Sequence, residues 1–584
     1  MNSHKQYTSG LQVVAVITAV SGWLLPECRA SIENPGLLPT PPMGFNGWSR
    51  FQCNINETIF TQTADAMIST GLQAAGYNRI NLDDCWMADS RTDQNTLTWN
   101  TTTFPHGLPW LGSYLTERGF YFGIYEDAGN VTCGGYPGSY NYEAIDAETF
   151  ASWGIDYLKV DGCNVSPGTE AEYHERYSTW HEVFNNMSSP LIFSQSAPAY
   201  FSKWITGSDN LTDWYTTMDY MPYNGELARH SSDIIVYALN ATSWDGVTSP
   251  WGSIMQNYVY EIQLARYQVP GYYNDPDFLI ADHPGLSLDE KKSQFALWAS
   301  FSAPLIISAW IPGLQEDVLS YLKNSDLIAI DQDKLAQQAT LVSRDGAFDV
   351  FSKSLDNSDR LVTVLNLGNT TSSTSISVPR IGLVEELLGV KVEYTAKDLW
   401  TGKTIIFQNK LEIKDLASHA TAVYRISLSA ILSELVIPTG LIFNDASFNC
   451  LTAESSNEKN TQIAFNTCSG ADEQVWQIRP LVGTVSPLSD TSLCLTARNK
   501  QAKLERCAVI PLDLYQQWDY SVRGYLTNRL TKECVTESTQ STLSTCQYED
   551  NSQIAFQVTI SHGFFLRRSL FIYHIPTKPL DIYR

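Results

Sequence analysis

Short apolar runs alternate with longer amphipathic stretches between residues 40 and 335, and this alternation restricts the fold of the 584-residue chain more than any other feature. The amphipathic stretches, such as Thr61–Ala75 and Glu170–Asn185, have helical spacing. We predict eight strands from the apolar runs: Met43–Trp48, Arg79–Asp83, Tyr121–Tyr125, Tyr157–Asp161, Leu191–Gln195, Trp214–Tyr220, Gly271–Asn274 and Pro304–Ser308. Eight strand–helix units in about 300 residues indicate a (β/α)8 TIM barrel. A doubly wound sheet is the alternative that this pattern leaves open.

The chain changes character after the barrel, which we expect to occupy residues 31–335. Residues 336–430 contain alternating, β-rich segments with turn residues between them: Phe348–Ser352, Leu361–Asn366, Thr374–Val378 and Ala422–Ile426. Such segments are typical of a small antiparallel β domain packed on a barrel.

The last part of the chain repeats itself. Cys450-Leu-Thr-Ala, Cys494-Leu-Thr-Ala and Cys534-Val-Thr-Glu are each followed by a second cysteine, and the first two then by Gln474-Val-Trp476 and Gln516-Gln-Trp518. Three copies with a period near 40 residues indicate a repeat architecture, and residues 437–584 resemble a ricin-type, lectin-like β-trefoil. A disulfide-linked β domain without a ligand is the alternative.

The resemblance suggests glycan binding by the trefoil, but the lobes depart from the sugar-binding pattern. The aspartate that often follows the first cysteine of a sugar-binding lobe is replaced by Thr452, Thr496 and Thr536. This replacement argues against sugar binding by these lobes.

The N-terminus has the features of a secretory signal peptide, which we place at residues 1–30. His4 and Lys5 precede an apolar run from Leu11 to Leu25, and Ala30 provides a small residue at the expected cleavage point. A membrane anchor is the alternative, but the run is too short to span a bilayer. We therefore predict a secreted, extracellular protein without a membrane partner.

Cysteines, sequons and charge agree with that location. Cleavage removes Cys28 and leaves ten cysteines, an even number that suggests disulfides in an oxidising compartment. Eight glycosylation sequons begin at Asn56, Asn100, Asn130, Asn164, Asn186, Asn210, Asn240 and Asn369. The formal net charge of −24 excludes a nucleic-acid partner, which requires a basic surface.

Asp161 is the first candidate for a catalytic group. It ends the predicted strand Tyr157–Asp161, where barrel enzymes place catalytic side chains, and Lys159 lies on the same face. A nearby cation keeps an aspartate ionised, as a nucleophile requires. If the reaction is the hydrolysis of a glycosidic bond, a second carboxyl group is needed as proton donor.

Asp233 is the candidate for that second carboxyl group. Arg229 precedes it by four residues, so the two side chains share a face if the segment is helical. An exposed surface pair is the alternative interpretation.

Further polar and aromatic residues follow other predicted strands. Asp83 and Asp84 are adjacent carboxylates after the second strand, and a ligand with several hydroxyls could bind both. Calcium binding is the rival explanation. Tyr125 ends the third strand, and Trp48 offers a flat apolar face for a sugar.

Together these segments resemble glycoside hydrolase family 27, the α-galactosidase and α-N-acetylgalactosaminidase family. The matching motifs occur in the family's order and cover most of the chain: Met43-Gly-Phe-Asn-Gly-Trp48, Asn81-Leu-Asp-Asp-Cys-Trp86, Gly123-Ile-Tyr-Glu-Asp127, Thr132-Cys-Gly-Gly-Tyr-Pro-Gly138, Tyr157-Leu-Lys-Val-Asp-Gly-Cys163 and Asn274-Asp-Pro-Asp277. With its trefoil, the chain looks like the secreted fungal members of the family.

The resemblance implies a retaining double displacement in which Asp161 is the nucleophile and Asp233 the acid/base. It implies that Asp83 and Asp84 bind O4 and O6 of galactose, Lys159 binds O3 and O4, and Arg229 binds O2. Trp48 and Tyr125 would shape the pocket, and Asp277 would line it. The implied disulfides are Cys53–Cys85 and Cys133–Cys163, and we expect Cys450–Cys468, Cys494–Cys507 and Cys534–Cys546 in the trefoil. No metal or other cofactor is implied.

The loop Ser194-Gln-Ser-Ala-Pro-Ala-Tyr200 departs from the animal members of the family, where it reads the sugar's 2-position. Galactosidases there carry Glu and Leu, whereas N-acetylgalactosaminidases carry Ser and Ala. Aligned on Pro198 and Tyr200, this chain has Ser196 and Ala199; shifted by one residue, Gln195 takes the Glu position. The side chain at that point decides which sugar fits.

We therefore predict an exo-acting α-galactosidase whose substrates are oligosaccharides or polysaccharides such as melibiose, raffinose-type sugars or galactomannan. The enzymatic alternative is an α-N-acetylgalactosaminidase or dual specificity. The alternative from another class is a lectin-like galactose-binding protein without catalysis.

Overall fold

The computed structural model describes residues 35–202, 212–237, 246–444, 447–454, 461–479, 482–509, 511–520, 524–537, 542–547 and 555–556. The signal peptide predicted for residues 1–30 lies outside this part of the chain, as do the sequons at Asn210 and Asn240.

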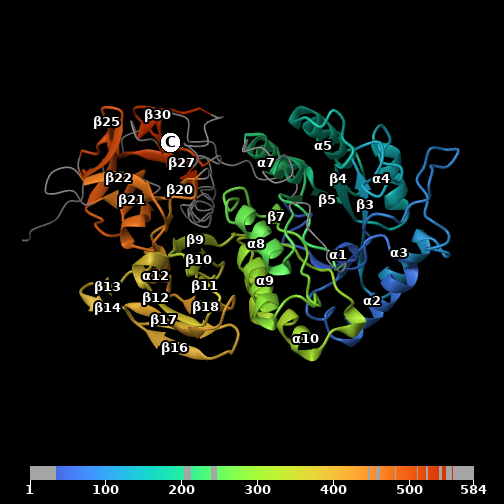
Figure 1. Cartoon of the computed structure of the whole chain (residues 1–584), viewed down its shortest axis with the longest axis horizontal. Coiled ribbons are helices and arrows are strands. Elements are labelled where there is room, and N and C mark those ends of the chain that lie inside the picture. Colours follow the sequence, from blue (N-terminus) through green and yellow to red (C-terminus); the bar gives the residue numbers. More distant parts are fainter. Residues whose placement is uncertain are drawn as a thin grey trace, which may run out of the picture.

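Eight parallel strands form the first sheet, in the order β7-β6-β5-β4-β3-β2-β1-β8 (Figure 1). A parallel bridge between Leu279, just after β7, and Ile307 of β8 closes the sheet into a ring. The prediction of a (β/α)8 barrel is therefore confirmed, and the doubly wound sheet is not found. The strands are β1 Met43–Asn46, β2 Arg79–Asn81, β3 Tyr121–Asp127, β4 Tyr157–Asp161, β5 Ile192–Gln195, β6 Leu227–Arg229, β7 Tyr273–Asp275 and β8 Leu305–Ile307.

Helices follow the strands and cover the outside of the barrel (Figure 1). The predicted helix Glu170–Asn185 has the bounds of α5, and α2 begins four residues before its prediction because the Asn56 side chain caps it by accepting from the Ile59 amide. The helices are α1 Trp48–Phe51, α2 Glu57–Ser69, α3 Leu108–Thr116, α4 Glu143–Ser152, α5 Glu170–Asn185, α7 Thr212–Asn224, α8 Pro250–Glu261, α9 Leu288–Phe301, α10 Glu316–Leu322 and α11 Ser325–Asp331.

The sixth strand was predicted in the wrong place. Trp214–Tyr220 lies within helix α7, and the strand is the three-residue β6 that follows it. The β-favouring aromatics of this segment concealed a helical period, because Trp214, Met218 and Met221 are all buried on one helix face. A strand as short as Leu-Ala-Arg gives no periodic signal.

The second part is the predicted antiparallel β domain, built on a six-stranded sheet in the order β16-β15-β18-β11-β10-β9. The pairs β12-β17 and β13-β14 complete it. Its strands are β9 Thr340–Arg344, β10 Phe348–Ser354, β11 Arg360–Asn366, β12 Ser372–Ser377, β13 Glu386–Leu387, β14 Val390–Lys391, β15 Tyr394–Asp398, β16 Thr404–Phe407, β17 Lys410–Leu416 and β18 Thr421–Ser427.

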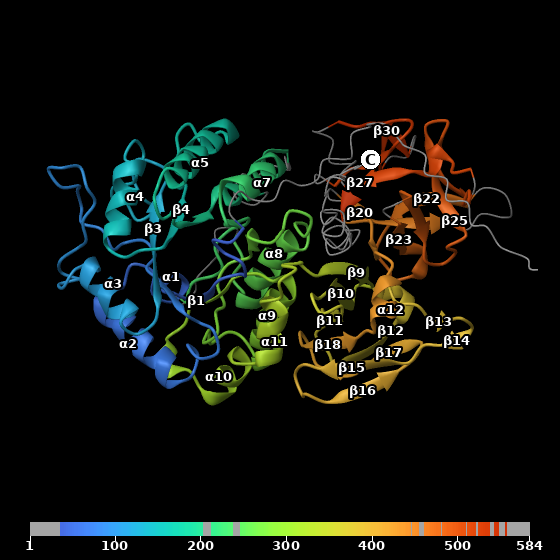
Figure 2. The same ribbon diagram turned by 180° about the vertical axis from the view of Figure 1, so that it is seen from behind.

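The third part is the β-rich trefoil, which follows the short helix α12 Ala430–Glu434 (Figure 2). Its three predicted disulfide pairs, Cys450–Cys468, Cys494–Cys507 and Cys534–Cys546, are all formed. Its described strands are β19 Thr439–Leu441, β20 Phe443–Asn444, β21 Cys450–Glu454, β22 Thr461–Asn466, β23 Val475–Arg479, β24 Thr484–Pro487, β25 Leu493–Arg498, β26 Gln501–Arg506, β27 Trp518–Tyr520, β28 Leu526–Asn528, β29 Glu533–Val535, β30 Leu543–Thr545 and β31 Ala555–Phe556.

Helix α9 joins the barrel to the β domain, because it contacts β8 on one side and β11 and β18 on the other (Figures 1 and 2). The fully buried Lys353 of β10 also crosses this boundary. Its ammonium group donates to the Ser302 hydroxyl at 2.7 Å and to the Ile330 carbonyl at 3.0 Å. The barrel therefore cannot separate from the β domain without exposing apolar surface and breaking buried hydrogen bonds.

Substitutions at two glycines of the motif Met43–Trp48 test how closely β1 and β2 pack. A methyl group on Gly44 would lie 2.3 Å from the Arg79 carbonyl oxygen, whereas one on Gly47 would meet its nearest neighbour, the Phe51 ring, at 3.7 Å. We expect Gly44→Ala to lower the free energy of unfolding by about 3 kcal/mol through overpacking. Gly47→Ala is the matched control and should change it by no more than about 1 kcal/mol. Urea unfolding measures both, and equal effects would contradict this account of the packing.

Candidate active site

Asp161 ends β4, where Tyr200 fixes one of its carboxylate oxygens. The Tyr200 hydroxyl donates to Asp161 Oδ1 at 2.5 Å, and the Gly162 amide donates to the same oxygen at 3.0 Å. Tyr173 stacks on Tyr200 with ring centroids 5.2 Å apart and donates to the Gly162 carbonyl. Oδ2 lies 3.6 Å from Cys133 Sγ, which belongs to a disulfide and has no hydrogen to donate, so none of the described residues donates a hydrogen bond to this oxygen.

Lys159 lies two residues before Asp161 and forms a buried ion pair with Asp83. Its Nζ atom is 3.0 Å from Asp83 Oδ2, and the Asn46 amide donates to the same oxygen at 2.7 Å. Burial lowers the pKa of Lys159, but the charges of Asp83, Asp161 and Asp233 outweigh burial and raise it overall. Lys159 is therefore charged, and its field acts on both candidate catalytic carboxylates.

Asp84 is held by backbone amides rather than by a cation. Gly134 and Cys85 donate to its two oxygens at 2.7 and 2.6 Å. Burial raises the pKa of Asp84 to about 6 despite these hydrogen bonds. The two adjacent carboxylates thus avoid repulsion, because one is paired with Lys159 and the other is protonated in acidic medium.

Asp233 follows β6 and is contacted by Arg229 and Trp48. Arg229 donates to Asp233 Oδ1 at 3.1 Å, and the Trp48 indole donates to Oδ2 at 3.2 Å. Burial raises the pKa of Asp233, but Arg229 and Lys159 outweigh it, so the pKa lies below its ordinary value. About one third of the Asp233 side chain is exposed, which leaves it accessible to a ligand.

The pairing of Arg229 with Asp233 does not come from a helix. Arg229 ends β6, and the segment up to Asp233 is irregular. The conditional expectation of a shared helix face is therefore wrong, although the contact exists. Asp277, after β7, orients this segment: its carboxylate lies 3.0 Å from an Arg229 nitrogen and accepts from the Ile234 amide at 2.7 Å.

The disulfide Cys133–Cys163 forms one wall of the site, and the other barrel pair, Cys53–Cys85, is formed as well. The Tyr125 hydroxyl donates to Cys133 Sγ at 3.2 Å, and Cys163 Sγ lies 3.2 Å from the Tyr200 hydroxyl. The bridge therefore holds both aromatic residues of the wall and links the loops that follow β3 and β4.

The loop after β5 directs Gln195 and Ser196 to different surroundings. The side-chain amide of Gln195 donates to the backbone carbonyls of Met221 and Leu227 at 3.0 and 3.3 Å, so its nitrogen is hydrogen-bonded to the backbone of the barrel. Ser196 and Ala199 are buried, and no hydrogen-bond partner to the Ser196 hydroxyl is found among the described residues. The small side chains at 196 and 199 leave more room than Glu and Leu would.

Three residues of this region carried no functional prediction. Asn46 supports Asp83, Tyr173 supports Tyr200, and Asp127 accepts the Cys163 amide at 3.0 Å. Asn46 and Asp127 stand in motifs that the sequence presented, but nothing in spacing indicated which neighbour each would bind.

The described residues offer no separate metal centre. One group, Asp127 with Cys133 and Cys163, has the geometry to hold an ion, but both cysteines are committed to a disulfide. Asp83 and Asp84 are already bound by Lys159 and by backbone amides, which removes the reason to invoke calcium there.

The repeated glutamines of the trefoil are internal. Gln474 donates to the Thr452 hydroxyl at 3.1 Å, and Gln516 donates in the same way to Thr496 at 3.1 Å. The indole of Trp476 is buried and donates to a backbone carbonyl. These motif residues hold the lobes together and are not free to bind a ligand.

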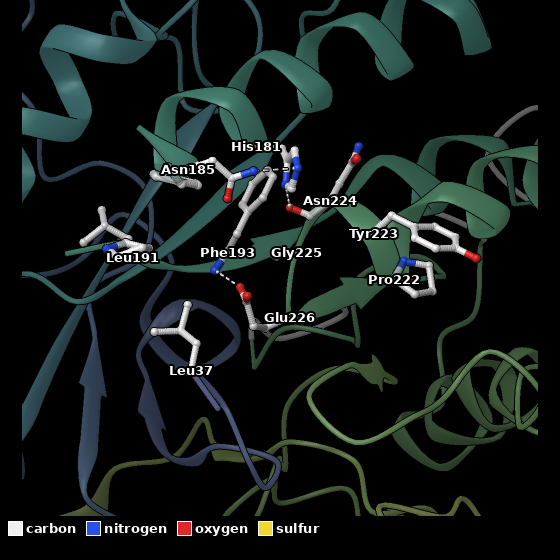
Figure 3. A pocket seen from close by; sticks show the side chains of 12 residues that line it. Leu37, His181, Asn185, Leu191, Phe193, Pro222, Tyr223, Asn224, Gly225 and Glu226 are labelled. Atoms are coloured by element: carbon white, nitrogen blue, oxygen red, sulfur yellow. Dashed lines mark hydrogen bonds between the residues drawn. The ribbon is translucent and has the colours of Figure 1, made fainter. Parts of the chain in front are cut away.

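A small cavity of about 50 Å³ lies at the opposite end of the barrel, where β5 and β6 begin (Figure 3). Glu226 at its edge accepts from the Phe193 amide at 2.8 Å, and burial raises the pKa of Glu226 to about 7. Catalytic groups of such barrels gather at the C-terminal strand ends, so this cavity is separate from the candidate site.

The surface of the described part is compatible with modification outside the cell. Asn56 and Asn100 accept backbone amides through their side-chain oxygens, which leaves their side-chain nitrogens open to glycosylation. The described segments include no helix with the length and apolar character needed to cross a bilayer.

Three family models match the three parts of the chain. Residues 40–333 match alpha galactosidase A, residues 345–426 match the alpha galactosidase C-terminal beta sandwich domain, and residues 438–554 match the ricin-type beta-trefoil lectin domain.

Similar proteins cover most of the chain. It is 56% identical to alpha-galactosidase A of Aspergillus niger over 93% of this chain and 95% of that protein, and 34% identical to the alpha-galactosidase of Oryza sativa over 68% and 86%. Among solved structures, alpha-galactosidase I of Mortierella vinacea matches with a TM-score of 0.60 and 27% identity, covering 68% of this chain and 99% of that one. The Saccharomyces cerevisiae alpha-galactosidase matches with a TM-score of 0.57 and 25% identity, covering 68% and 100%.

Buried carboxyl groups should make the protein most stable in acid. Burial raises the pKa of Asp84 to about 6, of Asp277 and Glu226 to about 7 and of Asp127 to about 8. Each folded-state pKa exceeds the unfolded value, so the folded chain binds more protons and loses about 1.4 kcal/mol per pH unit and group as pH rises toward that pKa. We expect the unfolding temperature to be highest near pH 4 and to fall from there to about pH 8, most steeply between pH 4 and 6, where all four groups contribute. Calorimetry over this range tests it, and a constant or rising temperature would contradict it.

Proposed function

This chain belongs to the alpha galactosidase A family, glycoside hydrolase family 27, and is an α-galactosidase; on that premise we propose that Asp161 and Asp233 perform its hydrolysis. The observation that carries the proposal is the placement of both carboxylates at the C-terminal strand ends, within the field of the buried Lys159. The alternative hypothesis of a non-catalytic lectin is rejected, because the chain is an α-galactosidase.

Asp161 is the nucleophile of a retaining double displacement. Its Oδ1 atom is held by Tyr200 and Gly162, so Oδ2 attacks the anomeric carbon and the bond to the leaving oxygen breaks. Water then attacks the galactosyl ester, and Asp161 is released as a carboxylate.

Asp233 donates the proton to the leaving oxygen and later removes one from water. In the free enzyme Arg229 and Lys159 hold the pKa of Asp233 low, which favours the carboxylate. A bound sugar covers the exposed third of Asp233 and offers Arg229 a hydroxyl to bind. Both changes favour the protonated form, and acidic medium favours it further.

The remaining polar residues position galactose. Asp83 and Asp84 accept hydrogen bonds from its hydroxyls, as the family resemblance implies for O4 and O6, while Lys159 and Arg229 donate to O3, O4 and O2. The rings of Trp48 and Tyr125 form walls of the pocket, and Asp277 holds Arg229 in place through their ion pair. Such a pocket fits a terminal galactose and makes the enzyme exo-acting.

The working location and the partners follow from the same features. We propose that the protein is secreted and acts on α-galactoside oligosaccharides or polysaccharides outside the cell, where its five disulfides are stable. Since the glutamines of the first two trefoil lobes are internal, any glycan binding by the trefoil would use other surfaces.

Replacing the nucleophile tests the assignment. We expect Asp161→Asn to lower kcat on p-nitrophenyl α-galactoside by at least about a thousandfold, because no group remains to form the ester. Asp156→Asn is the matched control. Asp156 immediately precedes the N-terminal end of β4 and pairs with Arg79 at 2.6 Å, so this substitution should affect stability rather than turnover. Circular dichroism checks that both fold, and a folded Asp161→Asn protein with wild-type rates would refute the role.

A second activity, on α-N-acetylgalactosaminides, is favoured by one observation. The Gln195 amide is committed to backbone carbonyls, so the small residues Ser196 and Ala199 are left at the 2-position of the sugar. Space for an acetamido group is what separates the two substrates.

Initial rates on p-nitrophenyl α-galactoside and α-N-acetylgalactosaminide, measured side by side in mild acid, test this second activity. We expect both to be hydrolysed, with the galactoside preferred. The variant Ser196→Glu with Ala199→Leu should lower the acetamido-to-galactoside ratio by about 10- to 200-fold through lost space. No acetamido hydrolysis by the wild type, or an unchanged ratio in the variant, would exclude it.

A further inference from the structure

Asn164 begins one of the predicted glycosylation sequons, yet its side-chain amide is engaged in the fold. It lies in the loop after β4, directly after Cys163. Its Nδ2 atom donates to the carbonyl oxygens of Val131 and Thr132, in the loop after β3, at 3.0 and 3.1 Å. An asparagine amide has two N–H groups, and two carbonyls are present here to accept them. The amide therefore links the two loops.

The two loops are in close contact around this amide. A methyl group on Gly129 would lie 2.5 Å from the backbone of Asn164, so the two backbones approach each other with no side chain between them. The Cys133–Cys163 disulfide joins the same loops at the residue after Thr132 and the residue before Asn164. The amide and the disulfide thus form two adjacent connections between the loops.

A glycan on this amide is incompatible with these hydrogen bonds. N-glycosylation replaces one hydrogen of the amide by a sugar carbon, which is bonded to the nitrogen at about 1.45 Å. That carbon would lie on the line toward a carbonyl oxygen only 3.0 or 3.1 Å from the nitrogen, where it would overlap the oxygen. A glycosylated Asn164 must therefore turn away from the loop after β3, so the glycan and the link exclude each other.

Asn56 and Asn100 begin sequons of a different kind. Their side-chain oxygens accept backbone amides, and none of the described residues is found to accept from their side-chain nitrogens. A glycan on either nitrogen leaves those hydrogen bonds in place. These two sequons are therefore matched references for the one at Asn164.

We propose that Asn164 carries no glycan in the active protein and is instead a positioning residue, whose unmodified amide holds the loop after β3 on the loop after β4. The held loop also carries the Gly134 amide, which donates to Asp84 Oδ2 at 2.7 Å. Loss of the link loosens this contact with a carboxylate that binds galactose in the proposed function. The effect on substrate binding rests on that function, whereas the unmodified state of Asn164 does not.

Mapping of the occupied sequons in the secreted, active protein tests the unmodified state. Enzymatic release of the N-glycans in water enriched in heavy oxygen converts each glycosylated asparagine into a labelled aspartate, which mass spectrometry of the peptides detects. We expect the label at Asn56 and Asn100 and none at Asn164. Label at Asn164 to the extent found at the other two would overturn the proposal.

Two variants that both destroy the sequon separate the link from the glycan. Ser166→Ala removes the exposed hydroxyl residue of the sequon but keeps the amide, whereas Asn164→Ala removes the amide as well. We expect Ser166→Ala to keep the KM and kcat of the wild type on p-nitrophenyl α-galactoside. Asn164→Ala should raise KM about three- to tenfold, the scale of one lost hydrogen bond, with a smaller change in kcat. Both variants should migrate like the wild type in electrophoresis, because no glycan is lost.

Equal KM values for the two variants would contradict the positioning role, and faster migration of Ser166→Ala would show that the wild type carries a glycan at Asn164. Should Asn164→Ala not be secreted, the mapping and the migration of Ser166→Ala still decide whether the amide is modified. Activity in a folded Asp161→Asn protein would remove the proposed function, and with it the expected rise in KM, but would leave the result of the mapping untouched.

Discussion

The site is governed by a shortage of positive charge. Seven carboxyl groups converge at or just behind the C-terminal strand ends, namely Asp83, Asp84, Asp127, Asp161, Asp233, Asp275 and Asp277, and the cations that act on them are Lys159 and Arg229. Two charges cannot neutralise seven, so the remaining acids are bound by backbone amides or carry protons. The positions of the loops follow from this requirement, because each amide donor must be brought to its acid.

The sharing of two cations also assigns different tasks to similar side chains. Lys159 binds Asp83 directly and reaches Asp161 and Asp233 only through its field, whereas Arg229 contacts Asp233 and Asp277. Asp161 keeps one oxygen on the Tyr200 hydroxyl and the other beside the sulfur of Cys133. In the proposed mechanism, chemically identical carboxyl groups thus act as a nucleophile, an acid/base and ligand-binding groups according to their neighbours.

Much of this site could be predicted from the sequence, because strand ends of a parallel barrel meet at one edge and motifs mark those ends. Asp161, Lys159 and Asp83 were found in that way. The sixth strand was missed because three residues give no period and the aromatic helix α7 imitates a strand. The hydrogen-bond partners of Asn46, Asp127 and Gln195 could not be predicted either. Hydrogen bonds between distant segments depend on loop geometry, which no local sequence pattern contains.

The disulfide Cys133–Cys163 makes one wall of the site depend on the redox state of the compartment in which the chain folds. Its sulfur atoms lie against the Tyr125 and Tyr200 hydroxyls, and it joins the loops that follow β3 and β4. This wall of the site is complete only after the two thiols have been oxidised, which ties its formation to an oxidising compartment.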